Sequence, residues 1–144
     1  MKIIIQDPAP EEEESIIISV RCMTDNITKA INMIKSPDSL TVYAETRAFF
    51  LPVSEIFYIE SVDLKTFVYS DKTVYRSRLK LYEVEERLEN NDFLRISKQT
   101  LVNVRKIKSV APAGESRFIA TLTNGEKVSI SRQYVPKLKE RFGL

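Results

Sequence analysis

The sequence contains no histidine, and this absence removes several classes of chemistry at once. A triad base, a histidine metal ligand and an imidazole pH switch all require that side chain. Only three glycines occur, at Gly114, Gly125 and Gly143, and they lie too far apart for a phosphate-binding loop or a dinucleotide-binding turn. We therefore expect no catalytic residue, no metal site and no cofactor, and the sequence favours a protein that is not an enzyme.

Cysteine and long apolar runs are also scarce. Cys22 is the single cysteine, so the chain cannot close an intramolecular disulfide, which is typical of proteins in reducing compartments. No run of 18 or more apolar residues is present, and the apolar start at residues 3–5 is too short for a signal peptide. The 144 residues can bury one hydrophobic core, and we expect a soluble protein in the cytoplasm.

Positive charge is concentrated at one end of the chain, although the formal net charge is only +2. Residues 1–40 contain 4 lysines and arginines against 7 acids, and residues 41–91 contain 7 against 9. Residues 92–144 contain 11 against 4. A basic field of this kind attracts polyanions and accelerates association with them, which indicates nucleic acid as a partner.

The first 39 residues have the pattern of a small separate unit. Two β-branched runs, residues 3–5 and 16–20, flank an acidic turn and predict two strands. Isoleucines then recur at helical spacing over Ile27–Ile34, behind a capping residue at position 24 or 25. The pattern predicts a ββα accessory unit over residues 1–39, ending at a proline-containing turn at residues 36–39.

Residues 40–144 have the pattern of a mainly β domain, because short β-branched and aromatic runs alternate with turn signals. The predicted strands are residues 40–44, 48–51, 56–60, 66–70, 73–77, 93–96, 106–111, 118–123 and 127–131. The Asn124-Gly125 pair is the strongest hairpin signal. Helices are predicted over Leu79–Asn90 and from Gln133 onward, since Pro136 is tolerated mainly in a first helical turn. The predicted fold class is mainly β (α+β), with one internal and one C-terminal helix.

Two segments of this domain combine cations with hydrogen-bonding side chains. Residues 92–107 contain Arg95, Lys98, Gln99, Asn103, Arg105 and Lys106. Cations suit phosphate, and a planar amide can pair with adenine through two hydrogen bonds. A solvated loop between two strands explains this segment equally well. The second segment is the corner before the last helix, where Arg132 and Gln133 lie beside free backbone amides that suit a phosphate or a groove edge.

Four motifs follow one another in the order IFYIES (56–61), LKLYEVEERL (79–88), FLRISKQTLVN (93–103), and NGE (124–126) with ISR (130–132). In this order they resemble the LytTR family of DNA-binding domains in bacterial response regulators, and the resemblance extends from about residue 40 to residue 144. It implies an elongated, mostly antiparallel β fold that reads DNA with loop residues. No recognition helix is expected.

The resemblance implies three sites that enter the grooves of DNA: Lys65 after the first motif, Lys98 and Gln99 after the strand that begins the third motif, and Arg132 before the last helix. The cations and amides of the two segments described above are added to these sites. The predicted DNA-contacting residues are then Lys65, Arg95, Lys98, Gln99, Asn103, Arg105, Lys106, Arg132 and Gln133.

The predicted function is sequence-specific binding of double-stranded DNA by a bacterial transcriptional regulator. The resemblance also implies a weak homodimer on DNA. Because residues 1–39 cannot hold a phospho-receiver domain of roughly 100 residues, it further implies control by a membrane-anchored protein. Two other functions remain open: a module that binds an acidic protein, and a single-strand nucleic-acid binder whose aromatic side chains stack on bases.

Overall fold

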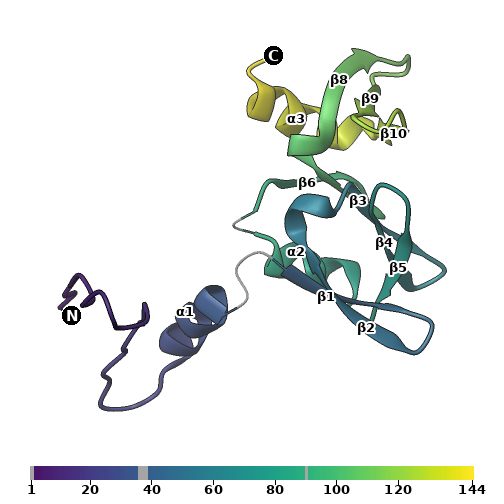
Figure 1. Ribbon diagram of the computed structural model, residues 1–144. Helices are drawn as coiled ribbons and strands as arrows, with labels where there is room; N and C mark the ends of the chain where they lie inside the picture. The colour runs from purple at the N-terminus through teal and green to yellow at the C-terminus, as the bar shows by residue number, and fades with distance from the viewer. Residues whose placement is uncertain (1, 36–38, 90) are drawn as a thin grey trace. The chain divides into compact units, whose positions relative to one another are not determined.

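The computed structural model describes residues 2–35, 39–89 and 91–144, and the chain forms two separate units, residues 1–37 and 38–144 (Figure 1). The predicted boundary at residues 36–39 falls mostly outside the described residues. Among the described residues, every buried hydrophobic side chain belongs to the second unit.

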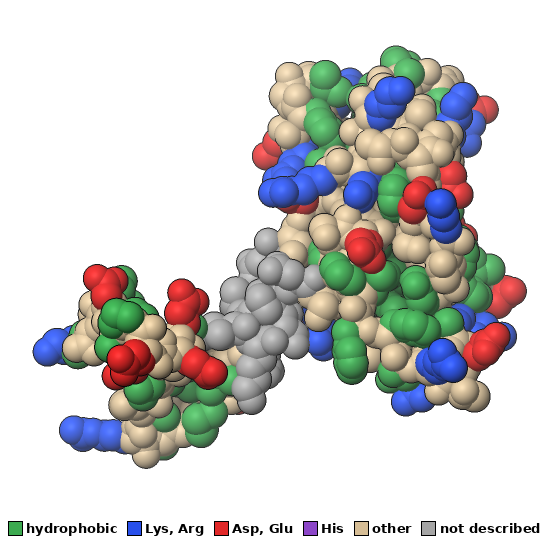
Figure 2. Space-filling view, in the orientation of Figure 1, with side chains coloured by type: hydrophobic (Ala, Val, Ile, Leu, Met, Phe, Trp, Pro, Cys, Tyr) green, Lys and Arg blue, Asp and Glu red, His purple; other side chains and the backbone are tan. Residues whose placement is uncertain are grey.

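The first unit contains the helix α1 (Asp25–Lys35), and its described residues before the helix form no strand. The Thr24 hydroxyl accepts a hydrogen bond from the Ile27 amide at 3.3 Å, so the predicted helix and its cap are confirmed. The two predicted strands are wrong, and Ile5 is 90% exposed. A lone two-stranded hairpin is marginally stable in water, and the described part of this unit has no third strand to support one. Figure 2 shows acidic and hydrophobic side chains side by side on the visible face of this unit.

The described residues of the second unit form two antiparallel sheets and two α-helices, together with short 3₁₀ helices. The strands are β1 (Ser39–Ala44), β2 (Arg47–Pro52), β3 (Tyr58–Val62), β4 (Lys65–Tyr69), β5 (Val74–Ser77), β6 (Phe93–Ser97), β7 (Thr100–Asn103), β8 (Ile107–Pro112), β9 (Phe118–Leu122) and β10 (Lys127–Ile130). The larger sheet has the order β2-β1-β5-β4-β3-β7-β6, and the smaller has the order β10-β9-β8. The helices are α2 (Leu81–Arg87) and α3 (Val135–Phe142). The mainly β, antiparallel fold predicted from the sequence is confirmed.

Two hydrophobic cores lie on opposite faces of the larger sheet. On one face, Val84 of α2 and Leu88, which follows α2, pack with Ile59 of β3. On the other face, Val102 of β7 packs with Leu138 of α3 and with side chains of the smaller sheet. In Figure 1 the smaller sheet and α3 lie at one end of this unit, and β1 and β2 lie at the other. The larger sheet contributes to the second core through β6, β7 and β3 and the residues that flank them. No described residue of β4 or β5 belongs to this core.

The strand β7 is the element that the sequence pattern does not predict. All four of its residues are buried, because Leu101 packs into the α2 core while Val102 packs into the opposite core. β7 lies between β3 and β6, and both of its faces are covered. A strand that is buried on both faces lacks the polar and apolar alternation by which half-buried strands are recognised.

Candidate nucleic-acid interface

Three connections meet at one end of the larger sheet, and backbone hydrogen bonds join them. The Ser61 amide donates to the Gln99 carbonyl at 2.8 Å, which links the β3–β4 turn to the β6–β7 turn. The Ser131 amide donates to the Ile96 carbonyl at 2.8 Å, which links the corner before α3 to β6. We call these connected segments the three-loop surface, defined as residues 61–65, 97–100 and 131–133.

Five of the predicted contact residues lie exposed on the three-loop surface. They are Lys65, Lys98, Gln99, Arg132 and Gln133. Lys65 begins β4, the next two form the β6–β7 turn, and the last two belong to a short 3₁₀ helix that leads into α3. The surface thus combines cations with planar amides, and each of the three loops contributes at least one of these groups.

The β3–β4 turn has an unusual backbone. Asp63 and Leu64 both have positive φ, 51° and 64°, as a two-residue type I′ hairpin turn requires. For a leucine this conformation costs about 1–2 kcal/mol. The Leu64 side chain is fully exposed at the tip of the turn, and it lies at the edge of a shallow depression of about 580 Å³ shared with Gln99. Sequence reasoning missed Leu64, although a leucine in a two-residue hairpin connection is itself a signal.

Arg95 lies beneath the β6–β7 turn and is engaged within the protein. Its Nη1 donates to the Lys98 carbonyl at 2.6 Å, and its Nε donates to Glu85 Oε2 of α2 at 3.1 Å. Its side chain is only 19% exposed. Arg95 therefore links the β6–β7 turn to α2.

Asn103, a predicted DNA-contacting residue, is 3% exposed. Its Nδ2 donates to the Ile56 carbonyl at 2.8 Å, and its Oδ1 accepts from the Arg105 amide at 3.1 Å. Both polar ends of the amide are thus occupied inside the protein. Asn103 fixes the chain where β7 leaves the sheet.

Arg105 and Lys106 lie beyond the end of β7 that is remote from the three-loop surface. Arg105 forms a hydrogen-bonded ion pair with Asp92, which also pairs with Arg141 of α3. The hydrogen bond from Arg105 holds the pKa of the Asp92 carboxyl below its usual value. The Lys106 ammonium lies 4.9 Å from the centre of the Phe57 ring. The structure does not bring these two cations together with Lys98 or Arg132.

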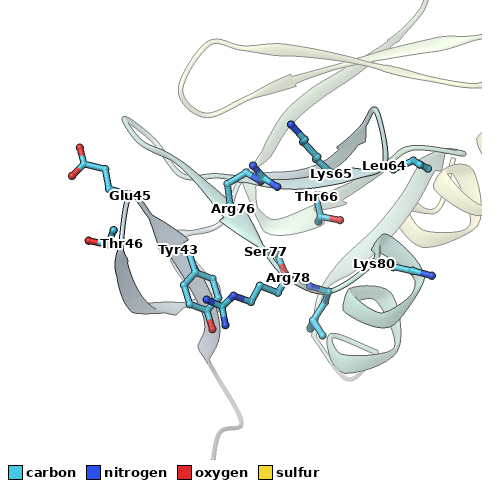
Figure 3. Close-up of a pocket in the computed structure, with 11 residues that line it drawn as sticks. Tyr43, Glu45, Thr46, Leu64, Lys65, Thr66, Arg76, Ser77, Arg78 and Lys80 are labelled. Carbon is cyan, nitrogen blue, oxygen red and sulfur yellow. Dashed lines mark hydrogen bonds between the residues drawn. The ribbon is translucent and has the colours of Figure 1, made fainter.

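Three further exposed cations, Arg76, Arg78 and Lys80, were missed by sequence reasoning. The sequence signal for them is that every second residue from 76 to 80 is a cation. Together with Lys65 they line a groove of about 510 Å³ on the larger sheet (Figure 3). The cationic surface is therefore wider than the three loops.

A family model described as the LytTr DNA-binding domain matches residues 46–143. The chain belongs to the LytTR family of DNA-binding domains. The matched residues contain the whole three-loop surface and the groove beside β5, apart from the Tyr43 and Glu45 side chains. The resemblance read from the motifs is thus confirmed.

A solved LytTr DNA-binding domain from Bacillus cereus is similar to this LytTR chain, with a TM-score of 0.70 and 28% sequence identity. The likeness covers 74% of this chain and 98% of the solved one. It supports the β-rich fold with its antiparallel sheets.

Several regulators are similar in sequence to this LytTR chain. The sensory transduction protein LytT of Enterococcus faecalis is 26% identical over 140 residues, which cover 94% of this chain and 58% of LytT. The transcriptional regulatory protein YpdB of Escherichia coli is 25% identical over 122 residues, which cover 84% of this chain and 50% of YpdB. The chain thus spans about half the length of these two relatives.

A third relative has nearly the same length as this chain. It is an uncharacterized HTH-type transcriptional regulator of Staphylococcus aureus, 26% identical over 147 positions that cover all of this chain and 99% of the relative. Within the described residues of the LytTR chain, no helix is both long and apolar enough to cross a membrane.

Proposed function

We propose that the chain is a transcriptional regulator that binds double-stranded DNA with a base preference, and that the three-loop surface reads the bases. The observation that carries this proposal is the pair of backbone hydrogen bonds, Ser61 to Gln99 and Ser131 to Ile96, which hold the three loops together. Loops fixed to a sheet present their side chains in constant register, which base readout requires. The relatives named as regulators support the same conclusion.

Each loop has a proposed task that follows from its side chains. Arg132 is suited to guanine, because a guanidinium can donate two hydrogen bonds to O6 and N7. Gln99 is suited to adenine through N6 and N7. Lys65 and Lys98 neutralise phosphates or contact guanine beside these positions.

Duplex DNA fits the three-loop surface better than a single strand does. Single-strand binders stack bases on aromatic side chains, and residues 61–65, 97–100 and 131–133 include no aromatic residue. The stacked tyrosines of β3 and β4 lie at the other end of this hairpin from its turn. Tyr58 stacks on Tyr69 with ring centres 4.2 Å apart, and burial raises the pKa of Tyr58.

Arg95, Arg105 and Lys106 are placed outside the proposed set of direct contacts. Arg95 is proposed as a positioning residue, because its guanidinium is bonded to Glu85 and to the Lys98 carbonyl. Arg105 and Lys106 lie past the far end of β7 and have partners within the protein. A duplex that touches Lys98 and Arg132 is not required to reach them.

A competition gel shift tests the proposal. Binding to a labelled random-sequence duplex is expected to be displaced by unlabelled duplex, and much less by single strands or by poly-glutamate. Lys98→Ala and Arg132→Ala are expected to weaken binding. Lys72→Ala, a matched control in the β4–β5 turn at the opposite end of β4, is expected to bind as the parent does. Stronger displacement by single strands, or full binding by both variants, would contradict the proposal.

Two partners are proposed with the DNA. Two copies of the chain bind paired sites weakly, and a membrane-anchored protein controls the regulator, which acts in the cytoplasm. The first unit supports a partner of this kind, because its Ile3, Ile4 and Ile5 side chains are 81%, 67% and 90% exposed. Sedimentation with duplexes of one or two sites tests the first proposal, and loss of binding to the partner after replacement of these isoleucines by serine tests the second.

A further inference from the structure

The groove beside β5 contains four cationic side chains and one carboxylate. Lys65, Arg76, Arg78 and Lys80 line it, and Glu45 of the β1–β2 turn is its acid. Figure 3 shows that the cations come from β4, from β5 and from the segment that leads into α2. The groove is therefore electropositive and is built from several elements.

The register of the sheet puts three of these cations on one face. Phe67 of β4 pairs with Arg76 of β5, and Thr66 pairs with Ser77, so Lys65 faces Arg78 one step further along. Because side chains alternate between faces, Lys65, Arg76 and Arg78 project to the same side. Like charges in neighbouring positions destabilise a sheet. The ion pairs among the described residues include none of these cations, so an external anion would stabilise this face.

Aromatic rings hold the two guanidinium groups in place. The Arg78 guanidinium carbon lies 4.1 Å from the centre of the Tyr43 ring, and that of Arg76 lies 5.2 Å from the centre of the Phe67 ring. An arginine stacked on a ring keeps the N–H groups at the edge of its plane available. Such pre-positioned N–H groups suit the oxygen atoms of a phosphate.

The groove is continuous with the three-loop surface. Leu64 lines both the groove and the depression that contains Gln99. In the strand order β6-β7-β3-β4-β5, four inter-strand spacings separate the ends, or about 19 Å. This span is shorter than one helical turn of DNA, about 34 Å. One duplex can therefore contact both places.

We propose that Arg76, Arg78 and Lys80 hold the sugar-phosphate backbone of the same duplex whose bases face the three-loop surface. This inference rests on the proposed function and extends it to a second contact region. The cations neutralise phosphates without reading bases, so they set the affinity and its salt dependence while the sequence preference stays with the loops.

Salt-dependent binding of the full chain to a duplex a few helical turns long tests the inference. The variants are Arg76→Gln and Arg78→Gln, singly and together, which keep exposed polar side chains. Because they remove like charges from one face, they are expected to melt at or above the melting temperature of the parent. The slope of log affinity against log salt is expected to fall by about 0.9 for each cation removed. Over a fourfold rise in salt, the double variant then loses affinity about tenfold less than the parent. Arg76→Lys is expected to restore the slope, and Lys72→Ala is expected to leave it unchanged.

The outcomes separate this inference from the function on which it rests. If the double variant keeps the parental slope while Lys98→Ala and Arg132→Ala still weaken binding, the groove proposal is wrong and the three-loop proposal stands. If the double variant also changes the preferred base sequence, the groove residues are not backbone contacts and the inference is equally overturned. A lower slope with an unchanged preference supports it.

Discussion

Arg132 and Gln99 are the residues on which base preference depends most in the proposed function. Replacement of either by alanine is expected to cost about 1–3 kcal/mol of binding free energy and to relax the preference at one base pair, because a bidentate contact is lost. Titration of each variant against a preferred duplex and its single-base variants measures this. An equal loss on every sequence would instead identify the residue as a phosphate contact.

Leu64 combines a strained backbone with full exposure, and these two properties predict opposite effects of one substitution. Leu64→Gly creates an Asp-Gly pair that suits a type I′ turn, so the free energy of unfolding is expected to rise by up to about 1 kcal/mol. Affinity for duplex DNA is expected to fall, because the apolar tip of the turn is lost. Thermal melting and binding are measured on the same sample. A variant that is more stable and binds as well as the parent would remove Leu64 from the interface.

At the residue scale, the sequence indicates which side chains can bond to phosphates or bases, but not which of them are exposed. Gln99 and Asn103 carry the same amide group four residues apart, yet Gln99 is exposed and Asn103 is 3% exposed. Arg95 and Lys98 are both cations, yet only Arg95 has a carboxylate within reach on α2. These differences arise from tertiary contacts with α2 and with the segment before β3, which local patterns do not contain.

At the element scale, the β6–β7 turn is supported from below by Arg95 and Glu85. Glu85→Gln removes a negative charge near the interface, and charge alone would make DNA binding tighter. The positioning role of Arg95 predicts the opposite result, a few-fold weaker binding, because the turn loses its support. The ion pair is partly exposed, so the stability cost is expected to be below about 1 kcal/mol. Tighter binding by this variant would contradict the positioning role.

Asp92 joins the start of β6 to Arg105 after β7 and to Arg141 of α3. Because the hydrogen bond from Arg105 lowers its pKa in the folded state, Asp92 stabilises the fold above the unfolded pKa of about 3.9. This contribution is lost as the pH falls through the lower folded pKa. Asp92→Asn is expected to lower stability by up to about 1 kcal/mol at pH 7 and to flatten the acid limb of the stability profile. The free energy of unfolding of both proteins is measured by denaturant at several acidic pH values. An equally steep loss of stability in the parent and in Asp92→Asn would show that Asp92 does not contribute to the acid dependence.

The elements themselves were predictable where one face of each is exposed. The hairpins of β1–β2 and β9–β10 and the helix α2 follow from alternation and helical spacing. The strand β7 did not follow, because Leu101 and Val102 face opposite cores. The two strands predicted before α1 failed for the converse reason, since a β-branched run forms a strand only when a neighbour pairs with it and covers it.

At the scale of the whole molecule, the antiparallel sheet order brings sequence-distant loops to one edge. Pairing of β3 with β7 brings residue 61 to residue 99, and contacts of β10 with β6 bring residue 131 to residue 96. The sequence placed cations in each loop, but only the order of the strands makes them one surface. The cation-rich groove beside β5 was not predictable, because residues 41–91 carry more acids than bases and their net charge hides it.

Selection of bound duplexes from a random-sequence pool tests the central claim most directly, namely that the three-loop surface reads bases in double-stranded DNA. The parent chain is expected to enrich one recurring motif, and a pair of such motifs at fixed spacing would indicate two copies. Selection with Arg132→Ala is expected to return the same motif with one base position relaxed. Recovery of bound duplexes without a common motif would contradict the account. The account would equally be contradicted if Arg132→Ala, Gln99→Ala and Lys98→Ala each returned the same motif as the parent.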